Sequence, residues 1–161
     1  MSVNKAKPYL YVIPEDRANS ILANGFHLEI QRERQMQVLE EANGWTKVLD
    51  EFTAVHIGEM ERDANRFIVL LIDFDGKPNR RDYVKGFIPS HLADRVFILG
   101  VWTKPEHLEG KLEGIGAALA KDCREGTAQT WDQPLLKHNE GEVARLRERV
   151  RPILSVTLQW R

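Results

Sequence analysis

The amino-acid sequence predicts an α/β fold of three layers, in which helices cover both faces of a mostly parallel sheet of four or slightly more strands. Apolar segments of strand length alternate along the chain with segments whose apolar residues recur at helical spacing. The run 67–72 consists of six large apolar residues, which is typical of a parallel strand buried on both faces. The connections between the strand segments are about as long as parallel pairing requires.

Composition indicates a single globular domain over residues 1–161. A chain of this length buries a substantial core, and its aromatic and aliphatic content is typical of a folded protein. The formal net charge is −1, from 23 Lys and Arg against 24 Asp and Glu. This balance excludes an overall polybasic character but leaves room for a local basic surface. Cys123 is the single cysteine, so an internal disulfide is excluded and a thiolate metal site has no support.

The sequence shows neither a secretion signal nor a membrane segment. The first eight residues lack an apolar signal core, and the run 67–72 is far too short to span a bilayer. We therefore expect a soluble cytoplasmic protein without a membrane partner.

The first strand is expected at residues 9–13, which are aromatic and β-branched, and Pro14 ends it. Residues 15–25 predict a short helix with acids in its first turn and a C-cap at its glycine. Glu15 consequently lies at the carboxyl end of a strand, where ligands gather in open α/β sheets. Charge complementarity with the start of the helix is a simpler reason for an acid there.

A second, more peripheral strand is expected at residues 35–39, where polar and apolar residues alternate. A long amphipathic helix follows Asn43-Gly44, with His56 on its flank as a packing or surface residue. The apolar stripe of this helix consists of Trp45, Val48, Leu49, Phe52, Val55 and Met60.

Two carboxylates end the buried run 67–72, which we take as the strand that organises the fold. Asp73 and Asp75 are two residues apart, so both side chains would point the same way in a continuing strand and reach one hard cation. Asp and Gly are also common turn residues, so Asp-Phe-Asp-Gly is open to a purely structural explanation. Three cations follow within a few residues and are candidates for holding phosphate oxygens of a nucleic acid: Lys77, Arg80 and Arg81.

A short helix at about 84–92 leads to another buried strand at 95–101. Thr103 after this strand is placed to begin a helix as its N-cap, and Glu106 three residues later fits a capping box. Glu106 also lies at the carboxyl end of a strand, so it is a candidate member of an acidic cluster.

The last third of the chain predicts helices. The first helical pattern runs to about residue 122 and contains glycines at 110, 114 and 116, which predict a weakened or broken helix. A final helix is expected at about 141–151. These segments form a C-terminal helical extension over about 113–161.

Glu15, Asp73 and Asp75 are expected to meet at one edge of the sheet. Neighbouring parallel strands stand ~4.8 Å apart, so acids at the same strand ends can surround one or two divalent cations. Carboxylates suit Mg²⁺ or Mn²⁺, and the absence of paired His and Cys argues against zinc.

These residues give the chain a resemblance to a known family. It resembles the Toprim domain, a Rossmann-like unit of topoisomerases, primases and small nucleases. It is most similar to the nuclease part of the overcoming-lysogenization-defect proteins and to small stand-alone relatives. The resemblance sets a Toprim-like core at about residues 8–112. The family's glutamate usually precedes a glycine, whereas Asp16 follows here. The resemblance is carried by Val12-Ile13-Pro14-Glu15, Val38-Leu39 with Asn43-Gly44-Trp45, Leu71-Ile72-Asp73-Phe74-Asp75-Gly76, and Phe97-Ile98-Leu99 with Pro105-Glu106-His107-Leu108.

The resemblance implies a Mg²⁺-dependent nuclease that hydrolyses phosphodiester bonds of DNA or RNA. It implies that Asp73 and Asp75 bind the metal, that Glu15 is a ligand or the general acid/base, and that Glu106 is an additional metal-ligating acid. Relatives often carry a basic residue beyond the core, for which Lys77 and Lys137 are the candidates.

Other functions stay open at this point. No Gly-x-x-x-x-Gly-Lys-Ser/Thr phosphate loop occurs, so ATP dependence would need an ATPase or other protein partner. A Toprim-like module without turnover would serve as a binding or regulatory subunit. A haloacid-dehalogenase-type phosphatase also uses a strand followed by Asp-X-Asp-Gly. Its pattern continues with Thr or Ser, whereas Lys77 stands there in this chain.

Overall fold

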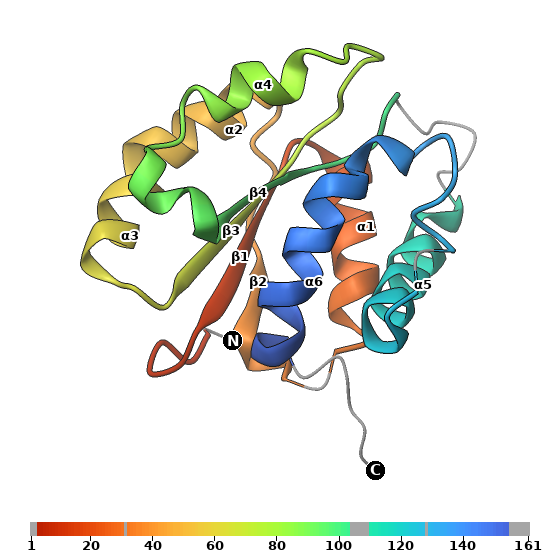
Figure 1. Ribbon diagram of the computed structural model, residues 1–161, viewed down its shortest axis with the longest axis horizontal. Coiled ribbons are helices and arrows are strands. Elements are labelled where there is room, and N and C mark those ends of the chain that lie inside the picture. The colour runs from red at the N-terminus through yellow and green to blue at the C-terminus, as the bar shows by residue number, and fades with distance from the viewer. Residues whose placement is uncertain (1–2, 31, 104–109, 128, 155–161) are drawn as a thin grey trace.

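The computed structural model describes residues 3–30, 32–103, 110–127 and 129–154 and shows the predicted parallel sheet (Figure 1). Four strands, all parallel, stand in the order β2-β1-β3-β4. The prediction of a four-stranded parallel sheet is therefore confirmed, as is the peripheral place of the second strand. The strands are β1 (Tyr9–Pro14), β2 (Met36–Val38), β3 (Arg66–Leu71) and β4 (Val96–Leu99).

Helices cover both faces of the sheet, so the molecule has three layers (Figure 1). One face packs against α1 (Arg17–His27), α5 (Leu112–Glu125) and α6 (Glu140–Leu154). The other face packs against α2 (Trp45–Glu51), α3 (Ile57–Arg62), α4 (Arg80–Lys85) and the 3₁₀ turn Ser90–Arg95. Two more 3₁₀ turns, Glu33–Gln35 and Lys137–Asn139, precede β2 and α6. No helix in these described ranges is long and apolar enough to cross a lipid bilayer.

All six residues of β3 are buried, and the five that follow Arg66 belong to the continuous apolar run from which a buried strand is predicted. Alternate residues feed the two halves of the core, because successive side chains of a strand point to opposite faces. Phe67, Val69 and Leu71 face the half that contains α1, α5 and α6. Ile68 and Leu70 face the other half. The C-terminal helices therefore share one continuous core with the sheet.

The long amphipathic helix expected after Gly44 forms, but a π-helical segment at Phe52–His56 divides it into α2 and α3. The wider turn rotates the following residues relative to a regular helix. Val55, which the periodicity places in the apolar stripe, is 50 % exposed. His56 is buried instead, and a hydrogen bond joins it to Arg66.

The expected break in the helix after residue 110 is not found, because α5 runs through Gly114 and Gly116 without interruption. These glycines have different surroundings. A Cβ on Gly116 would lie 2.1 Å from the carbonyl oxygen of Leu22, and a Cβ on Gly25 would lie 2.1 Å from that of Glu113. Nothing lies within 4 Å of a Cβ on Gly114. Gly25 and Gly116 therefore allow α1 and α5 to pack backbone to backbone.

Candidate metal centre

Main-chain hydrogen bonds beyond the end of β1 position Glu15. Its N–H donates to the carbonyl oxygen of Leu71, at 2.8 Å, and so continues the pairing of β1 with β3. Its own carbonyl oxygen accepts from the N–H groups of Asn43 and Gly44, at 2.8 and 3.2 Å. The backbone of Glu15 is thus fixed between the end of β3 and the start of α2.

The segment after β3 is held in the same way. Ile72 donates its N–H to the carbonyl oxygen of Leu99, and Phe74 donates to that of Val101, both at 2.9 Å. The ring of Phe74 is 1 % exposed. The residue between these two bonds, Asp73, therefore has little freedom to move.

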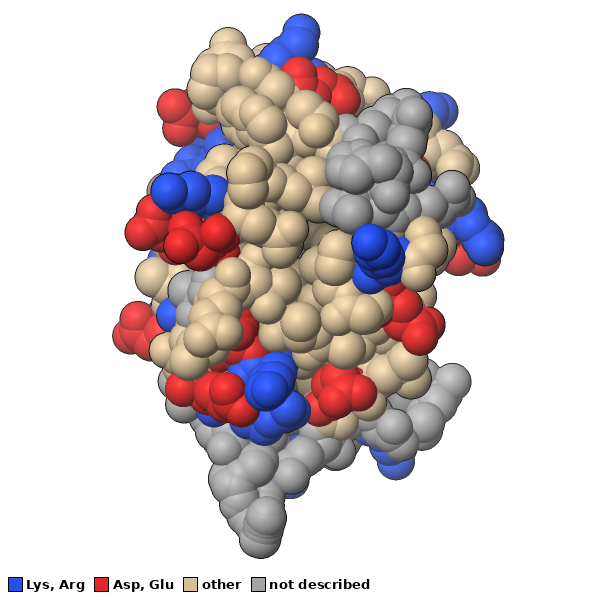
Figure 2. Space-filling view, turned by 90° about the vertical axis from the view of Figure 1, so that its right-hand side faces the viewer, with Lys and Arg blue, Asp and Glu red and all other residues tan. Residues whose placement is uncertain are grey.

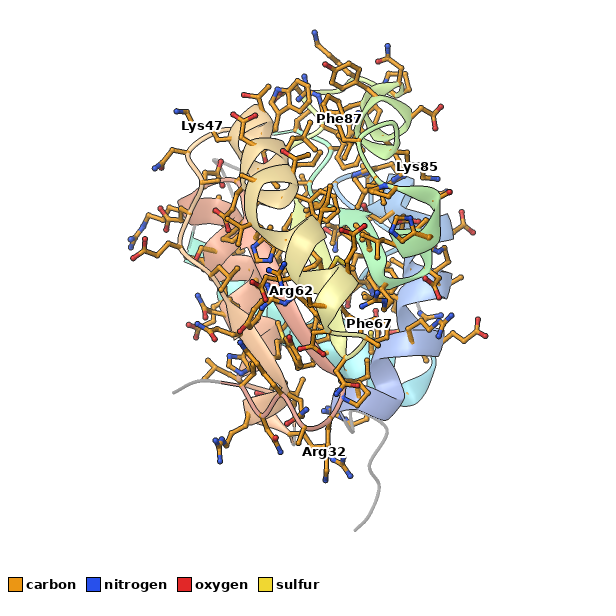
Figure 3. The ribbon with its side chains drawn as sticks, turned by 90° about the vertical axis from the view of Figure 1, so that its left-hand side faces the viewer. Arg32, Lys47, Arg62, Phe67, Lys85 and Phe87 are labelled. Carbon is orange, nitrogen blue, oxygen red and sulfur yellow. The ribbon has the colours of Figure 1, made fainter. Side chains whose placement is uncertain are left out.

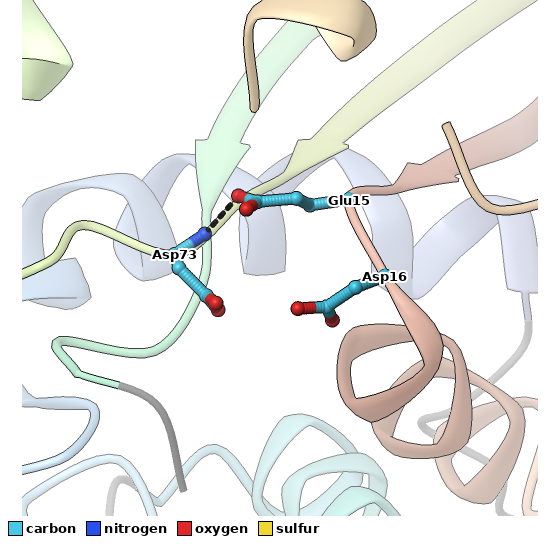
Figure 4. Close-up of side chains that lie close together, drawn as sticks. All are labelled: Glu15, Asp16 and Asp73. Atoms are coloured by element: carbon cyan, nitrogen blue, oxygen red, sulfur yellow. Dashed lines mark hydrogen bonds between the residues drawn. The ribbon is translucent and has the colours of Figure 1, made fainter. Parts of the chain in front are cut away.

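Three carboxyl groups meet at this edge of the sheet (Figure 4). Glu15, Asp16 and Asp73 each offer one oxygen atom, and these atoms all lie within 4.8 Å of one another. The N–H of Asp73 donates to Oε1 of Glu15, at 2.7 Å. Such a group can hold a metal ion. We refer to Glu15, Asp16 and Asp73 as the acidic triad.

Asn19 joins two members of the acidic triad. Its Nδ2 donates to Oδ1 of Asp16 and to Oδ1 of Asp73, both at 2.9 Å. Asp16 is also the N-cap of α1, because its Oδ1 accepts the N–H of Asn19. Asn19 is 1 % exposed and Asp73 is fully buried. The second oxygen of Asp73, Oδ2, is buried without a hydrogen-bond partner in the described part of the chain.

Burial and nearby negative charge make ionisation of Glu15 and Asp73 unfavourable. The pKa of Glu15 is raised to about 7, chiefly by burial and also by the charges of Asp73, Asp16 and Asp75, against the opposing effect of the hydrogen bond from the Asp73 N–H. The pKa of Asp73 is raised to about 6, chiefly by burial and also by Asp16, while the hydrogen bond from Asn19 opposes this shift. A carboxylate with an unpaired buried oxygen and negative neighbours is stabilised by a cation.

Asp75 does not join the acidic triad, in contrast to the expected alignment with Asp73. The strand ends at Leu71, and Asp75 has a φ of 51°, so the alternation of a continuing strand no longer applies. Its Oδ2 accepts from Nη1 of Arg80, at 2.5 Å. The same nitrogen donates to the carbonyl oxygen of Asp73, at 3.0 Å. Asp75 therefore holds Arg80 beside the triad.

The four basic residues singled out in the sequence have different surroundings. Arg80 is 8 % exposed, and its guanidinium lies 4.2 Å from the ring centre of Trp45. Arg81 donates to the carbonyl oxygens of His138 and Ile98 and to the side chain of Asn139. Both arginines thus have partners within the protein.

The two lysines are more accessible than the arginines. Lys77 is exposed, and Lys137 is exposed with its Nζ 3.8 Å from Asp132. Glu106 lies outside the described residues.

Sequence reasoning missed Asp16 and Asn19. The sequence predicts Asp16 in the first turn of a helix, whereas α1 begins at Arg17 without an acid in its first turn and Asp16 is its N-cap. An N-cap residue at the carboxyl end of a strand also faces the ligand-binding edge. The spacing of Asp16 and Asn19 is the signal that places both side chains at the start of α1.

The chain matches no protein-family model, no curated protein and no solved structure. The resemblance to the Toprim domain therefore stays a prediction. Inference about function rests on the acidic triad and its surroundings.

Proposed function

We propose that the protein is a metal-dependent phosphodiester hydrolase, a Toprim-like nuclease that acts on DNA or RNA. The observation that carries the proposal is the acidic triad, which lies at the carboxyl edge of a parallel sheet and contains a fully buried carboxylate with one oxygen that has no hydrogen-bond partner among the described residues. Ligands bind at this edge in open α/β folds. Glu15, Asp16 and Asp73 would hold the ion.

Mg²⁺ or Mn²⁺ fits this set of donors best. All three side chains offer carboxylate oxygen, which hard cations prefer, and the triad contains neither His nor Cys. When bound, such an ion neutralises a phosphate and activates water for attack. The residues of the chain supply the rest: Asn19 orients Asp16 and Asp73, while Arg80 is held against Asp73 by Asp75. Lys77, exposed in the turn that follows, is available to a phosphate.

A cleavage assay tests the proposal. The purified protein is incubated with plasmid, single-stranded and double-stranded DNA, and RNA, each with Mg²⁺, Mn²⁺ or EDTA. We expect cleavage of at least one substrate with Mg²⁺ or Mn²⁺ and none with EDTA. Metal binding without cleavage of any substrate would contradict the nuclease and favour a binding or regulatory subunit, alone or with a partner protein.

The raised pKa values predict a pH-dependent stability of the metal-free protein. Because folding raises the pKa of Glu15 to about 7 and that of Asp73 to about 6, the native state keeps protons that the unfolded state has lost. Between pH about 4 and about 7, the contribution of these two carboxyl groups to the free energy of unfolding therefore falls as pH rises. Saturating Mg²⁺ at pH 8 should raise the melting temperature again.

Thermal unfolding of the wild type and of the variant Glu15→Gln, Asp73→Asn checks this. His56 and His138 have lowered pKa values and act in the opposite direction, but both proteins contain them. We expect the variant to gain stability relative to the wild type across this pH range and to lose the response to Mg²⁺. Parallel pH profiles in the two proteins would contradict the assignment.

A further inference from the structure

Three aromatic side chains form a row: Trp45 begins α2, Tyr83 lies in α4, and Phe87 follows the C-cap of α4. The ring of Trp45 lies 5.7 Å from that of Tyr83, and Tyr83 lies 5.3 Å from Phe87, each pair edge to face. Tyr83 is 57 % exposed and Phe87 is 40 % exposed. We refer to Trp45, Tyr83 and Phe87 as the aromatic surface.

The aromatic surface begins beside the acidic triad. The guanidinium of Arg80 lies over the ring of Trp45 and donates to the carbonyl oxygen of Asp73. Gly44, immediately before Trp45, donates its N–H to the carbonyl oxygen of Glu15. Arg80 and Gly44 therefore each link the triad to the aromatic surface. A polymer bound at the triad can extend along the aromatic surface.

Exposed large apolar side chains are not spread evenly over the described part of the protein. Of the four large apolar side chains that are exposed in the described ranges, two belong to the aromatic surface and lie in contact with each other. The other two, Leu28 and Val55, belong to different helical segments. Contiguous exposed aromatic rings are a common mark of a binding surface.

Positive charge accompanies the aromatic surface. Lys47 and Lys85 lie on either side of Phe87 in the view of Figure 3. Lys77 is exposed in the turn after Asp75. None of these three lysines forms an ion pair with another residue that the structure describes. Asp82 is an exposed acid on the same helix, α4, as Lys85.

The face that carries α5 has a different arrangement of charged side chains (Figure 2). There the described Lys and Arg side chains are interspersed with Asp and Glu around an uncharged centre. Lysines without an ion pair to a described residue also occur at α5, where Lys111 and Lys121 are exposed. The exposed rings are therefore what distinguishes the aromatic surface from this face. Exposed rings with flexible cations are the combination that binds single-stranded nucleic acid, because bases stack on rings and lysines attract the backbone.

We propose that the aromatic surface binds unpaired bases, so that the substrate is a single-stranded nucleic acid or a single-stranded part of one. Tyr83 and Phe87 stack with bases, while Lys47, Lys77 and Lys85 attract the phosphates that lead to the acidic triad. This inference rests on the proposed nuclease function and specifies its substrate.

Binding of fluorescent oligonucleotides, measured by anisotropy in EDTA, tests the proposal without cleavage. The two probes are oligo-dT and an abasic strand of equal length, which has the same phosphates and no bases. We expect the wild type to bind oligo-dT about 10-fold more tightly than the abasic strand, as stacking on one or two rings provides. The variant Tyr83→Ala, Phe87→Ala should reduce this ratio to about 2-fold or less.

Two further variants control the experiment. Leu28→Ala removes another exposed apolar side chain, at the end of α1 away from the triad, and should leave the ratio unchanged. Tyr83→Trp should preserve it, because a ring remains. Equal affinity of the wild type for both probes would overturn the proposal. The proposal would also be overturned if the wild type eluted as a dimer in size-exclusion chromatography and the variant Tyr83→Ala, Phe87→Ala eluted as a monomer, because a second copy would then cover the rings.

The outcomes separate this inference from the nuclease proposal. Base-dependent binding by a protein that cuts no substrate would support the aromatic surface and refute the nuclease. Metal-dependent cleavage of single-stranded and duplex substrates at equal rates, with equal binding of the two probes, would support the nuclease and refute the aromatic surface.

Discussion

Asp73→Asn is expected to abolish metal-dependent cleavage and, at the same time, to stabilise the metal-free protein. Activity should fall roughly 10³-fold or more, because an amide cannot replace the buried carboxylate in the proposed metal site. Stability at pH 8 should rise by roughly 1–3 kcal/mol, because the neutral side chain no longer repels Glu15 and Asp16. The amide oxygen introduced at position 73 still accepts the hydrogen bond from Nδ2 of Asn19. Cleavage rates and melting temperatures in EDTA measure the two effects.

The opposite signs make the result specific to the site. A variant that merely misfolds would lose both activity and stability. Asp50→Asn is the matched control, since Asp50 is exposed on α2 and its replacement should change neither property beyond error. Unchanged cleavage by the Asp73→Asn protein would show that a contaminant or another site cuts the substrate.

Gly100→Ala is expected to unfold the protein or destabilise it by about 4 kcal/mol or more. Gly100 has a φ of 151°, and a Cβ there would lie 1.6 Å from the carbonyl oxygen of Ile72. Asn139 binds both backbone groups of this residue, accepting its N–H and donating to its carbonyl oxygen. A side chain at this position would therefore push apart the ends of β3 and β4 and displace Asp73. Chemical denaturation measures the loss.

Gly141→Ala is the control for this variant. Nothing lies within 4 Å of a Cβ on Gly141, in the first turn of α6, so alanine should be neutral or slightly stabilising there. A Gly100→Ala protein as stable as the wild type would mean that the ends of β3 and β4 are less closely packed than described.

The parallel sheet and the meeting of strand ends at one edge could be predicted from the sequence. The unbroken apolar run of β3 indicates a strand buried on both faces, and the alternation with helical segments indicates parallel pairing. Since parallel strands end at the same edge, Glu15 and Asp73 had to approach each other although 58 residues separate them. Two of the three members of the acidic triad follow from this reasoning.

The remaining differences arise from local backbone geometry that residue patterns do not specify. The rule that side chains two residues apart share a face holds only in a continuing strand, and the positive φ of Asp75 ends that regularity. Gly116 illustrates the same limit. Its low helix propensity suggests a break, but the close approach of α1 outweighs that cost, because only a residue without a Cβ fits there.

The two roles of Asp16, in starting α1 and in the acidic triad, predict how distantly related chains can be recognised. One carboxylate begins α1 and also faces Glu15 and Asp73, and no residue intervenes between the end of β1, the acidic pair and the helix. An inserted residue at this junction would shift the helix start relative to the sheet and separate both acids from their neighbours. The length of the junction is therefore a stricter signature than the identity of any single residue in it. Distant homologues should preserve an ungapped strand-acid-acid-helix connection even where the surrounding apolar residues have diverged.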